Sequence, residues 1–115
     1  MSLPTLAPDA TPAPSPTAAP ALVGVFDSGV GGLSVLRALH RHLPATPMLY
    51  VADSAHAPYG DRDTPHVLRR SQRIARHLVS RGAKLIVVAC NTATALAIDQ
   101  LRREFPGVDF VGVEP

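Results

Sequence analysis

The sequence has few of the residues that build disulfides, metal sites and cofactor pockets. Its 115 residues include one cysteine, Cys90, no tryptophan, and five tyrosines and phenylalanines together. A single cysteine excludes an internal disulfide and a multi-cysteine metal cluster, and it suits a reducing compartment such as the cytoplasm. His56 is a candidate metal ligand by residue type. Because it has no second ligand at metal-binding spacing, we interpret it as a loop residue and expect no metal.

The chain also lacks a long hydrophobic run and a concentrated charge. No apolar stretch reaches the roughly 18 residues that a spanning helix needs, so we expect no membrane segment. The net charge is only +2, although ten of the eleven cationic side chains are arginine. Nucleic-acid binding usually combines a basic face with aromatic or motif support, and that support is thin here. We therefore expect neither a membrane nor a nucleic acid as partner.

A proline-rich segment precedes the rest of the chain. Residues 1–20 hold six of the twelve prolines, spaced among Ala, Thr and Ser without apolar periodicity. Such a composition predicts a disordered extension. A signal peptide is not expected, because a basic start and a continuous apolar stretch are both lacking. Residues 21–115, in a chain that is 46% hydrophobic, are expected to form one domain with a real core.

Short apolar runs alternate with segments of helical spacing throughout that domain. Strands are predicted at residues 21–26, 48–52, 85–89 and 109–113, and helices at residues 33–43, 64–81 and 93–105. In the second helix we expect Thr64 as the cap, Pro65 in the first turn and Gly82 as the stop. The order β-α-β-α-β-α-β predicts an α/β fold, a parallel sheet with helices on both faces.

Cys90 lies at a strand-to-helix turn. It follows the apolar run of residues 85–89, and the two residues after it, Asn91 and Thr92, are of the kind that cap helices. Ligands tend to bind at such turns in α/β sheets, and the amide groups of the following helix favour an anion, a thiolate included. Cys90 is therefore a candidate nucleophile or base. A buried structural cysteine is the alternative that this segment by itself leaves open.

The turn after the first strand is rich in glycine. Asp27 ends the strand, and glycines follow at positions 29, 31 and 32, where they permit a close approach to a ligand. A dinucleotide site is disfavoured, because Ser34 stands where that fingerprint needs Gly or Ala, and Asp53 is the only candidate for its acidic residue. Asp27 either serves a ligand or simply caps the turn.

The loop of residues 53–63 lies at the carboxyl end of the second strand. Within it, Tyr59 and Gly60 are predicted to present a hydroxyl and a bare amide, both able to hold a carboxylate. Because parallel strands bring their carboxyl ends to one edge, Asp27, Tyr59 and Cys90 should converge there. Their convergence favours a site for an amino acid or another carboxylate.

The second helix is rich in arginine. Arg69, Arg70, Arg73 and Arg76 are expected to lie on solvated helix surface rather than on a nucleic-acid face.

Four motifs in a fixed order resemble one known family. They are VFDSGVGGLSV at residues 25–35, APYG at 57–60, ACNTAT at 89–94 and GVEP at 112–115. Together they resemble the amino-terminal half of glutamate racemase, and the resemblance covers residues 23–115. It implies two similar α/β domains facing each other across a cleft. It also implies interconversion of L- and D-glutamate for bacterial peptidoglycan without a cofactor.

The resemblance implies roles for particular residues. Cys90 would be one of two acid–base thiols, taking the α-proton of D-glutamate as a thiolate and returning a proton as a thiol. Asp27 would assist it. The residues that would hold the substrate are Asp27, Ser28, Tyr59, Gly60, Asn91 and Thr92.

The length of the chain departs from that family. Racemisation removes a proton from one face of the α-carbon and returns one to the other, so two opposed groups are needed. The family's second thiol lies in a half that is absent here. We therefore expect a fragment that lacks the carboxy-terminal domain, is inactive or nearly so, and is prone to aggregate. For the full-length protein, a homodimer is one expectation.

Other functions remain as alternatives. A sister racemase or isomerase acting on aspartate or a related carboxylate is one, and a non-catalytic carboxylate-binding module is another. A cysteine phosphatase is excluded because Leu96 replaces the arginine expected six residues after the nucleophile. Dithiol redox chemistry is excluded because position 93 is Ala.

Overall fold

A computed structural model describes residues 21–29 and 31–113. The predictions for residues 1–20 and 114–115 therefore lie outside the described residues. The strands are β1 (Leu22–Asp27), β2 (Met48–Ala52), β3 (Ala83–Val88) and β4 (Asp109–Gly112), and the helices are α1 (Gly32–His42), α2 (Thr64–Ser80) and α3 (Asn91–Glu104). All strand pairs are parallel, in the order β2-β1-β3-β4.

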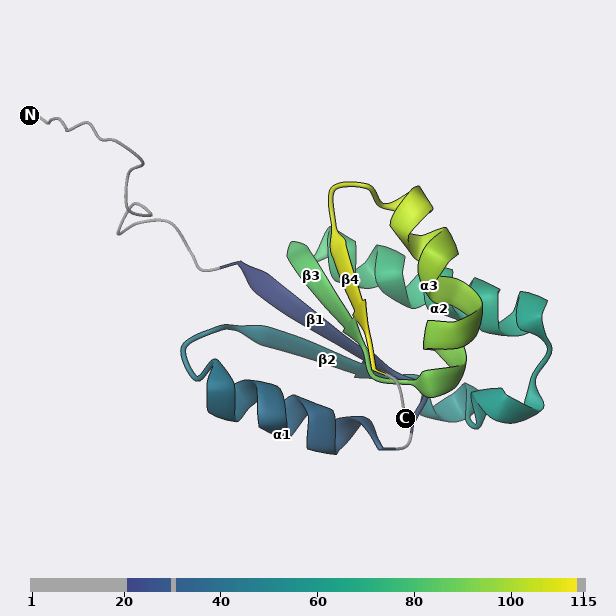
Figure 1. The fold of residues 1–115 in the computed structure, drawn as a ribbon, viewed down its shortest axis with the longest axis horizontal. Helices are drawn as coiled ribbons and strands as arrows, with labels where there is room; N and C mark the ends of the chain where they lie inside the picture. The colour runs from purple at the N-terminus through teal and green to yellow at the C-terminus, as the bar shows by residue number, and fades with distance from the viewer. Residues whose placement is uncertain (1–20, 30, 114–115) are drawn as a thin grey trace, which may run out of the picture.

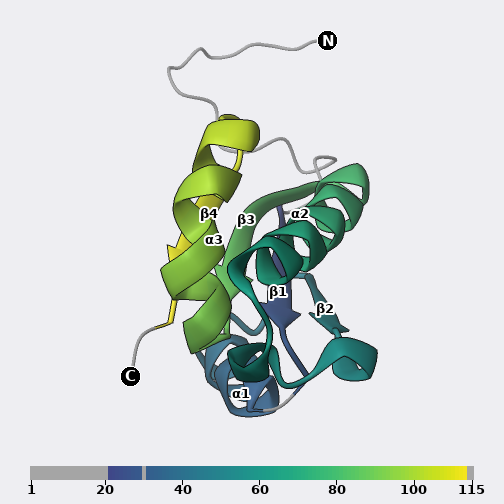
Figure 2. The same ribbon diagram turned by 90° about the vertical axis from the view of Figure 1, so that its right-hand side faces the viewer.

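The helices cover both faces of the sheet. Figure 1 shows α1 on one side and both α2 and α3 on the other, and the turned view in Figure 2 agrees with this arrangement. The predicted fold class is confirmed, because each of the first three strands is followed by a helix that crosses back to the next parallel strand.

Side chains of the central strands alternate between two apolar clusters. Phe26, Ile86 and Val88 belong to the larger cluster, which also contains buried residues of α2 and α3. Val23, Val25 and Val87 point into the smaller cluster and pack against α1. This alternation follows from the two-residue period of a strand, and it explains why β1 and β3 read as continuous apolar runs.

The sequence does not show which apolar residues of each helix are buried. Leu33 and Leu96 are 53% and 40% exposed, whereas Val35 packs against the smaller cluster and Ile98 is buried. In α2, Val67 is fully buried. Apolar spacing predicts a helix, and packing against the sheet determines which of its apolar residues are covered.

The ends of α2 are close to the predicted ones. Its amino-terminal cap is Asp63 rather than Thr64, because the Asp63 carboxylate accepts the amide hydrogen of His66 at 2.9 Å. Pro65 lies in the first turn, and the helix ends at Ser80, ahead of Gly82. These features confirm the predicted proline start and glycine stop.

The long loop after β2 is partly ordered into short turns. Two 3-10 helices, η1 (Ser54–His56) and η2 (Tyr59–Asp61), occupy most of it. Their turns bring residues 58–60 back over the edge of the sheet where β1 and β3 end. None of the described helices has the length and apolar character to cross a membrane.

Candidate active site

A cavity of about 470 Å³ lies at the carboxyl ends of β1 and β3. Three turns form its walls: the turn after β1, the loop after β2 and the turn after β3. They meet because β1 lies between β2 and β3, and all three strands run in the same direction. The lining residues are Ser28, Gly31, Ser34, Val35, Pro58, Tyr59, Gly60, Ala89, Cys90, Asn91, Thr92 and Val113.

Cys90 lies at the amino-terminal end of α3 and lines this cavity. Its side chain is the helix cap: the sulfur accepts the amide hydrogen of Ala93 at 3.5 Å. The prediction that Asn91 and Thr92 are the caps is wrong, because they are the first two residues of the helix. Cys90 is 8% exposed and also belongs to the core cluster. The amino-terminal end of α3 therefore lies at a sulfur that borders both the core and the cavity.

Asp27 lies beside the cavity but is not among its lining residues, whereas its neighbour Ser28 is. The Asp27 carboxyl group is fully buried. One oxygen, Oδ2, accepts hydrogen bonds from the Gly32 amide at 3.1 Å and from the Tyr50 hydroxyl at 3.0 Å. The other, Oδ1, has no hydrogen-bond partner among the described residues. Asp27 therefore accepts from the first amide of α1 and keeps one buried oxygen that no described residue uses.

Gly32 makes the approach of Asp27 to α1 possible. A Cβ atom at this position would lie 2.5 Å from the Asp27 carboxyl carbon. Only glycine leaves room for the carboxylate to reach the backbone amide.

Tyr50 is the second donor to the same oxygen of Asp27. The pKa of the Tyr50 hydroxyl is raised by burial and by its hydrogen bond to Asp27.

Tyr59 lines the cavity, but its hydroxyl is bonded to a carboxylate. The residue is 1% exposed, and the hydroxyl donates to Asp53 Oδ2 at 2.5 Å. The prediction that this hydroxyl is presented to a ligand is therefore wrong in this structure. Gly60 does face the turn after β3, since a Cβ atom added to it would lie 3.9 Å from the Thr92 hydroxyl oxygen.

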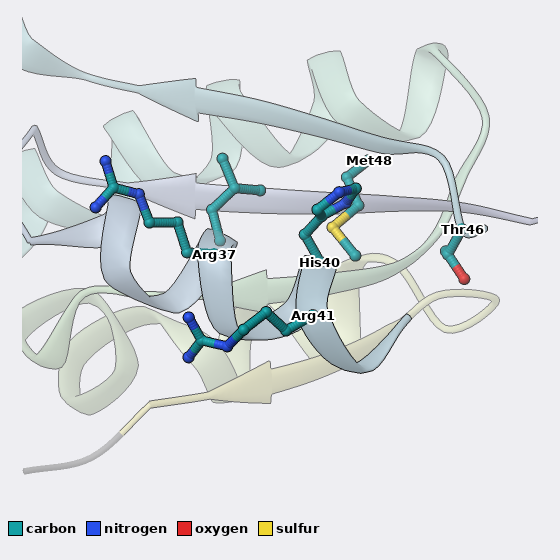
Figure 3. A pocket seen from close by; sticks show the side chains of 6 residues that line it. Arg37, His40, Arg41, Thr46 and Met48 are labelled. Carbon is teal, nitrogen blue, oxygen red and sulfur yellow. The ribbon is translucent and has the colours of Figure 1, made fainter. Parts of the chain in front are cut away.

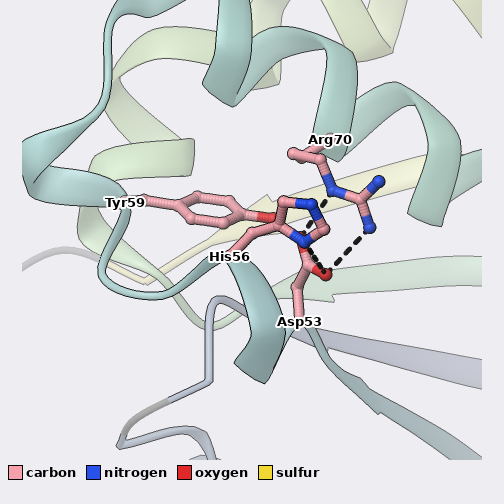
Figure 4. Close-up of polar contacts among 4 residues, drawn as sticks. All are labelled: Asp53, His56, Tyr59 and Arg70. Carbon is pink, nitrogen blue, oxygen red and sulfur yellow. Dashed lines mark hydrogen bonds and ion pairs between the residues drawn. The ribbon is translucent and has the colours of Figure 1, made fainter.

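Asp53 holds a buried cluster of charged and polar groups next to the cavity (Figure 4). Arg70 binds it through two hydrogen bonds, Nε to Oδ2 and Nη2 to Oδ1, both 2.8 Å long. His56 Nδ1 lies 3.3 Å from Oδ1. Burial by itself raises the pKa of the Asp53 carboxyl, but the hydrogen bonds from Arg70 and Tyr59 and the positive charge of Arg70 lower it to about 2.

The prediction of solvated surface is wrong for Arg70. Its side chain is 23% exposed and paired with a carboxylate that is 8% exposed. The position offered a signal, since residue 70 borders the buried positions 67, 71 and 74 of α2. A cation there requires a buried anion, and the sequence does not show which acid approaches it.

Two lining residues, Ser34 and Pro58, are not among the residues predicted to hold the substrate. Ser34 lines the cavity from the first turn of α1, and its hydroxyl donates to the Gly31 carbonyl at 3.0 Å. Its position close behind the glycine-rich turn could have indicated a site residue. Pro58 could have been found in the same way, because it directly precedes Tyr59 and Gly60 in the predicted site loop.

A second, larger cavity lies away from these groups. It measures about 620 Å³ and is bordered by the carboxy-terminal half of α1 and the start of β2 (Figure 3). Its apolar floor includes Leu36 and Met48, and its polar lining is basic, with no thiol or carboxylate: Arg37, His40, Arg41 and Thr46. Volume alone therefore does not locate the chemistry, and we place the candidate site at Cys90. The described residues contain no group of three metal-ligating side chains.

No protein-family model matches the chain, but individual proteins match it closely. A glutamate racemase of Pseudomonas paraeruginosa is 56% identical over 93 residues, which is 81% of this chain and 35% of the relative. A glutamate racemase of Methylococcus capsulatus is 57% identical over 93 residues, or 81% of this chain and 34% of the relative. The chain resembles glutamate racemases. It spans about a third of the length of these curated relatives.

Solved glutamate racemases share the fold of the chain. The enzyme from Aquifex pyrophilus has a TM-score of 0.76 at 42% identity, over 79% of this chain and 36% of that structure. The Thermus thermophilus enzyme, solved with β-chloro-D-alanine, has a TM-score of 0.75 at 48% identity, over 80% and 36%. The Francisella tularensis enzyme, solved with D-glutamate, has a TM-score of 0.75 at 32% identity, over 78% and 34%. The predicted resemblance to glutamate racemase is thus confirmed in sequence and in fold.

Proposed function

We propose that this chain is part of a cofactor-independent glutamate racemase and supplies one of its two acid–base thiols, Cys90. The observation that carries the proposal is the position of Cys90. Its sulfur caps α3 and lines a cavity whose other walls carry hydroxyl, amide and backbone groups. The identity of 56% to a glutamate racemase supports the choice of substrate.

In this proposal the thiolate of Cys90 removes the α-proton of D-glutamate. The amide groups at the start of α3 stabilise the thiolate before the reaction. The carbanion then takes a proton on its opposite face from a second thiol. When the reaction starts from L-glutamate, the second group removes the α-proton as a thiolate, and Cys90 gives the carbanion a proton as a thiol. One thiol on a rigid helix end reaches only one face of the α-carbon, so the second thiol must come from elsewhere.

The substrate would be held by groups on all three walls. We propose that Ser28, Asn91 and Thr92 bind its carboxylates, together with the backbone around Tyr59 and Gly60. The free buried oxygen of Asp27 gives that residue a separate role. A carboxylate oxygen that has no partner among residues 21–29 and 31–113 and lies beside the cavity can accept from the substrate amine or from the Cys90 thiol.

Residues 21–115 would form the first α/β domain, and the second thiol would lie on a second domain outside these 115 residues. The share of the relatives that the chain matches, about 35%, supports this division. The biological product would be D-glutamate for peptidoglycan, made in the cytoplasm. A homodimer of the full-length protein remains a prediction.

Exchange of the α-proton with solvent tests the proposal. A protein that carries this chain and has the full length of the relatives should exchange the α-proton of both glutamate enantiomers in deuterium oxide, as followed by proton NMR. Cys90→Ala should abolish the exchange of D-glutamate. Full exchange in that variant, or none in the parent, would contradict the proposal. Turnover of aspartate but not glutamate would favour the sister enzyme instead.

The 115-residue chain permits a simpler test. Glutamate should slow the alkylation of Cys90 by iodoacetamide. N-acetylglutamate and glutarate have no free amine, so the protection they give shows whether the amine contributes to binding. Saturable protection without any proton exchange in the longer protein would identify a non-catalytic carboxylate-binding module.

A further inference from the structure

One wall of the Cys90 cavity comes from a loop rather than from a strand or helix end. Pro58, Tyr59 and Gly60 belong to the connection between β2 and α2, and they line the cavity opposite the start of α3. Loops are the most mobile parts of a fold unless side chains hold them. What fixes this wall therefore decides the shape of the cavity.

The wall is tied to α2 through a buried carboxylate. The Tyr59 hydroxyl donates to Asp53 Oδ2, and the Arg70 guanidinium clamps both oxygens of the same carboxylate. Figure 4 shows the three side chains converging from the loop, the end of β2 and α2. A bidentate arginine fixes the orientation of a carboxylate as well as its charge, because two parallel hydrogen bonds allow one arrangement.

The same loop also touches the turn after β1. A Cβ atom added to Gly29 would lie 2.9 Å from Ser54 Cα and 3.0 Å from Ala57 Cβ, so the two segments are in close contact. Gly60 in turn approaches Thr92 at the start of α3. A displacement of the loop would therefore change its contacts with two other walls of the cavity.

The Asp53 carboxyl and the Tyr59 hydroxyl keep their protonation states at neutral pH. The pKa of the Asp53 carboxyl is lowered to about 2, and burial and the bond to Asp53 raise the pKa of the Tyr59 hydroxyl. The hydrogen bond between these two groups therefore holds the loop throughout the neutral pH range.

We propose that Arg70 is a positioning residue for the Cys90 cavity, which acts through Asp53 and Tyr59 to hold the wall formed by residues 58–60. Arg70 does not touch the cavity and is not a catalytic residue. The inference deepens the proposed function in one respect, since it takes glutamate as the ligand that the wall helps to bind. Loss of Arg70 should weaken glutamate binding and leave the alkylation of unliganded Cys90 nearly unchanged.

The test is protection of Cys90 in the 115-residue chain, measured as the glutamate concentration that halves the rate of alkylation by iodoacetamide. Arg70→Gln should raise that concentration about tenfold, equivalent to roughly 1.4 kcal/mol. Arg70→Lys should fall between the parent and Arg70→Gln, because it keeps the charge but loses the paired hydrogen bonds.

Two control variants separate positioning from general damage. Arg73→Gln removes an exposed arginine of the same helix that forms no ion pair among the described residues. Ile74→Ala removes a buried aliphatic side chain of α2, which destabilises a fold without breaking the tie to the loop. Both should keep the protection of the parent chain at a temperature well below their unfolding transitions.

The outcomes are distinguishable. Equal protection in Arg70→Gln and Ile74→Ala would overturn the inference while leaving the proposed function intact. If glutamate does not protect the parent chain, the substrate proposal fails, and hydrogen exchange of the amides at residues 59–62 decides the inference instead. Faster exchange there in Arg70→Gln than in Ile74→Ala supports the positioning role, and equal exchange refutes it.

Discussion

Two buried aspartates at the ends of neighbouring strands have opposite surroundings. Asp27 ends β1 and Asp53 follows β2, and the Asp53 amide donates to the Asp27 carbonyl at 2.9 Å. Both are removed from solvent, with side chains 0% and 8% exposed. Asp53 contacts a cation, a phenol and a histidine. Within the described part of the chain, Asp27 accepts from a backbone amide and a phenol through Oδ2 alone.

The difference separates a carboxylate bound through both oxygens from one with an oxygen that no described residue uses. Burial of a charge is tolerated where a partner balances it, as Arg70 does for Asp53. A buried polar atom without a partner is costly and uncommon in folded proteins. In the proposed function, the more complete network supports the site and the less complete one serves the reaction.

Removal of the Asp53 charge should have the largest effect on stability. Asp53→Asn leaves the half-buried guanidinium of Arg70 without its anion and should cost about 3 kcal/mol of unfolding free energy. Asp27→Asn should cost about 1 kcal/mol, since an amide oxygen still accepts from Gly32 and Tyr50. Urea denaturation of both variants measures the contrast, and equal losses would refute it.

Filling the space beside Asp27 should also cause a large loss of stability. Gly32→Ala places a methyl group 2.5 Å from the Asp27 carboxyl carbon, and the resulting shift should cost about 2 kcal/mol. Gly107→Ala is the matched control, because a Cβ atom there meets nothing within 4 Å. Thermal unfolding of the two variants compares them. A neutral Gly32→Ala would mean that Asp27 does not need its contact with α1.

Acid should weaken the chain partly through Asp53. The pKa of this carboxyl is about 2 in the folded chain and about 3.9 when unfolded, so its ionised form contributes roughly 2 to 3 kcal/mol at neutral pH. A lowered folded pKa means that this stability is present above pH 4 and is lost as the pH falls toward 2. The unfolding free energies of the parent chain and Asp53→Asn should therefore converge over that range. A constant gap would contradict the assignment.

The smallest expected losses of stability come from removing the hydroxyl groups of Tyr59 and Tyr50. Tyr59→Phe removes a fully buried hydrogen bond to a charged carboxylate and should cost about 1.5 kcal/mol. Tyr50→Phe should cost about 0.5 kcal/mol, because Tyr50 is only half-buried and Asp27 keeps its bond to Gly32. Chemical denaturation resolves the order of the two losses, and the reverse order would be inconsistent with the two environments.

Much of the fold was predictable because local chemistry determines it. The continuous apolar run before Cys90 predicted a strand with both faces buried, and the residues after it predicted a helix. The alternation of strands and helices then predicted a parallel sheet and the convergence of Asp27, Tyr59 and Cys90 at one edge. Tyr59 and Cys90 do line one cavity there, and Asp27 lies beside it, next to the lining residue Ser28.

The sequence alone thus determined the order of elements, the position of the thiol and the resemblance to glutamate racemase, because these depend on residues close together in the chain. Only the tertiary structure decided which groups are paired. Asp53 and Arg70 are 17 positions apart, and nothing local shows that the Tyr59 hydroxyl turns to Asp53 rather than to the cavity. Such pairings arise where strand ends, a loop and a helix pack together, since burial then forces each charge to find its partner.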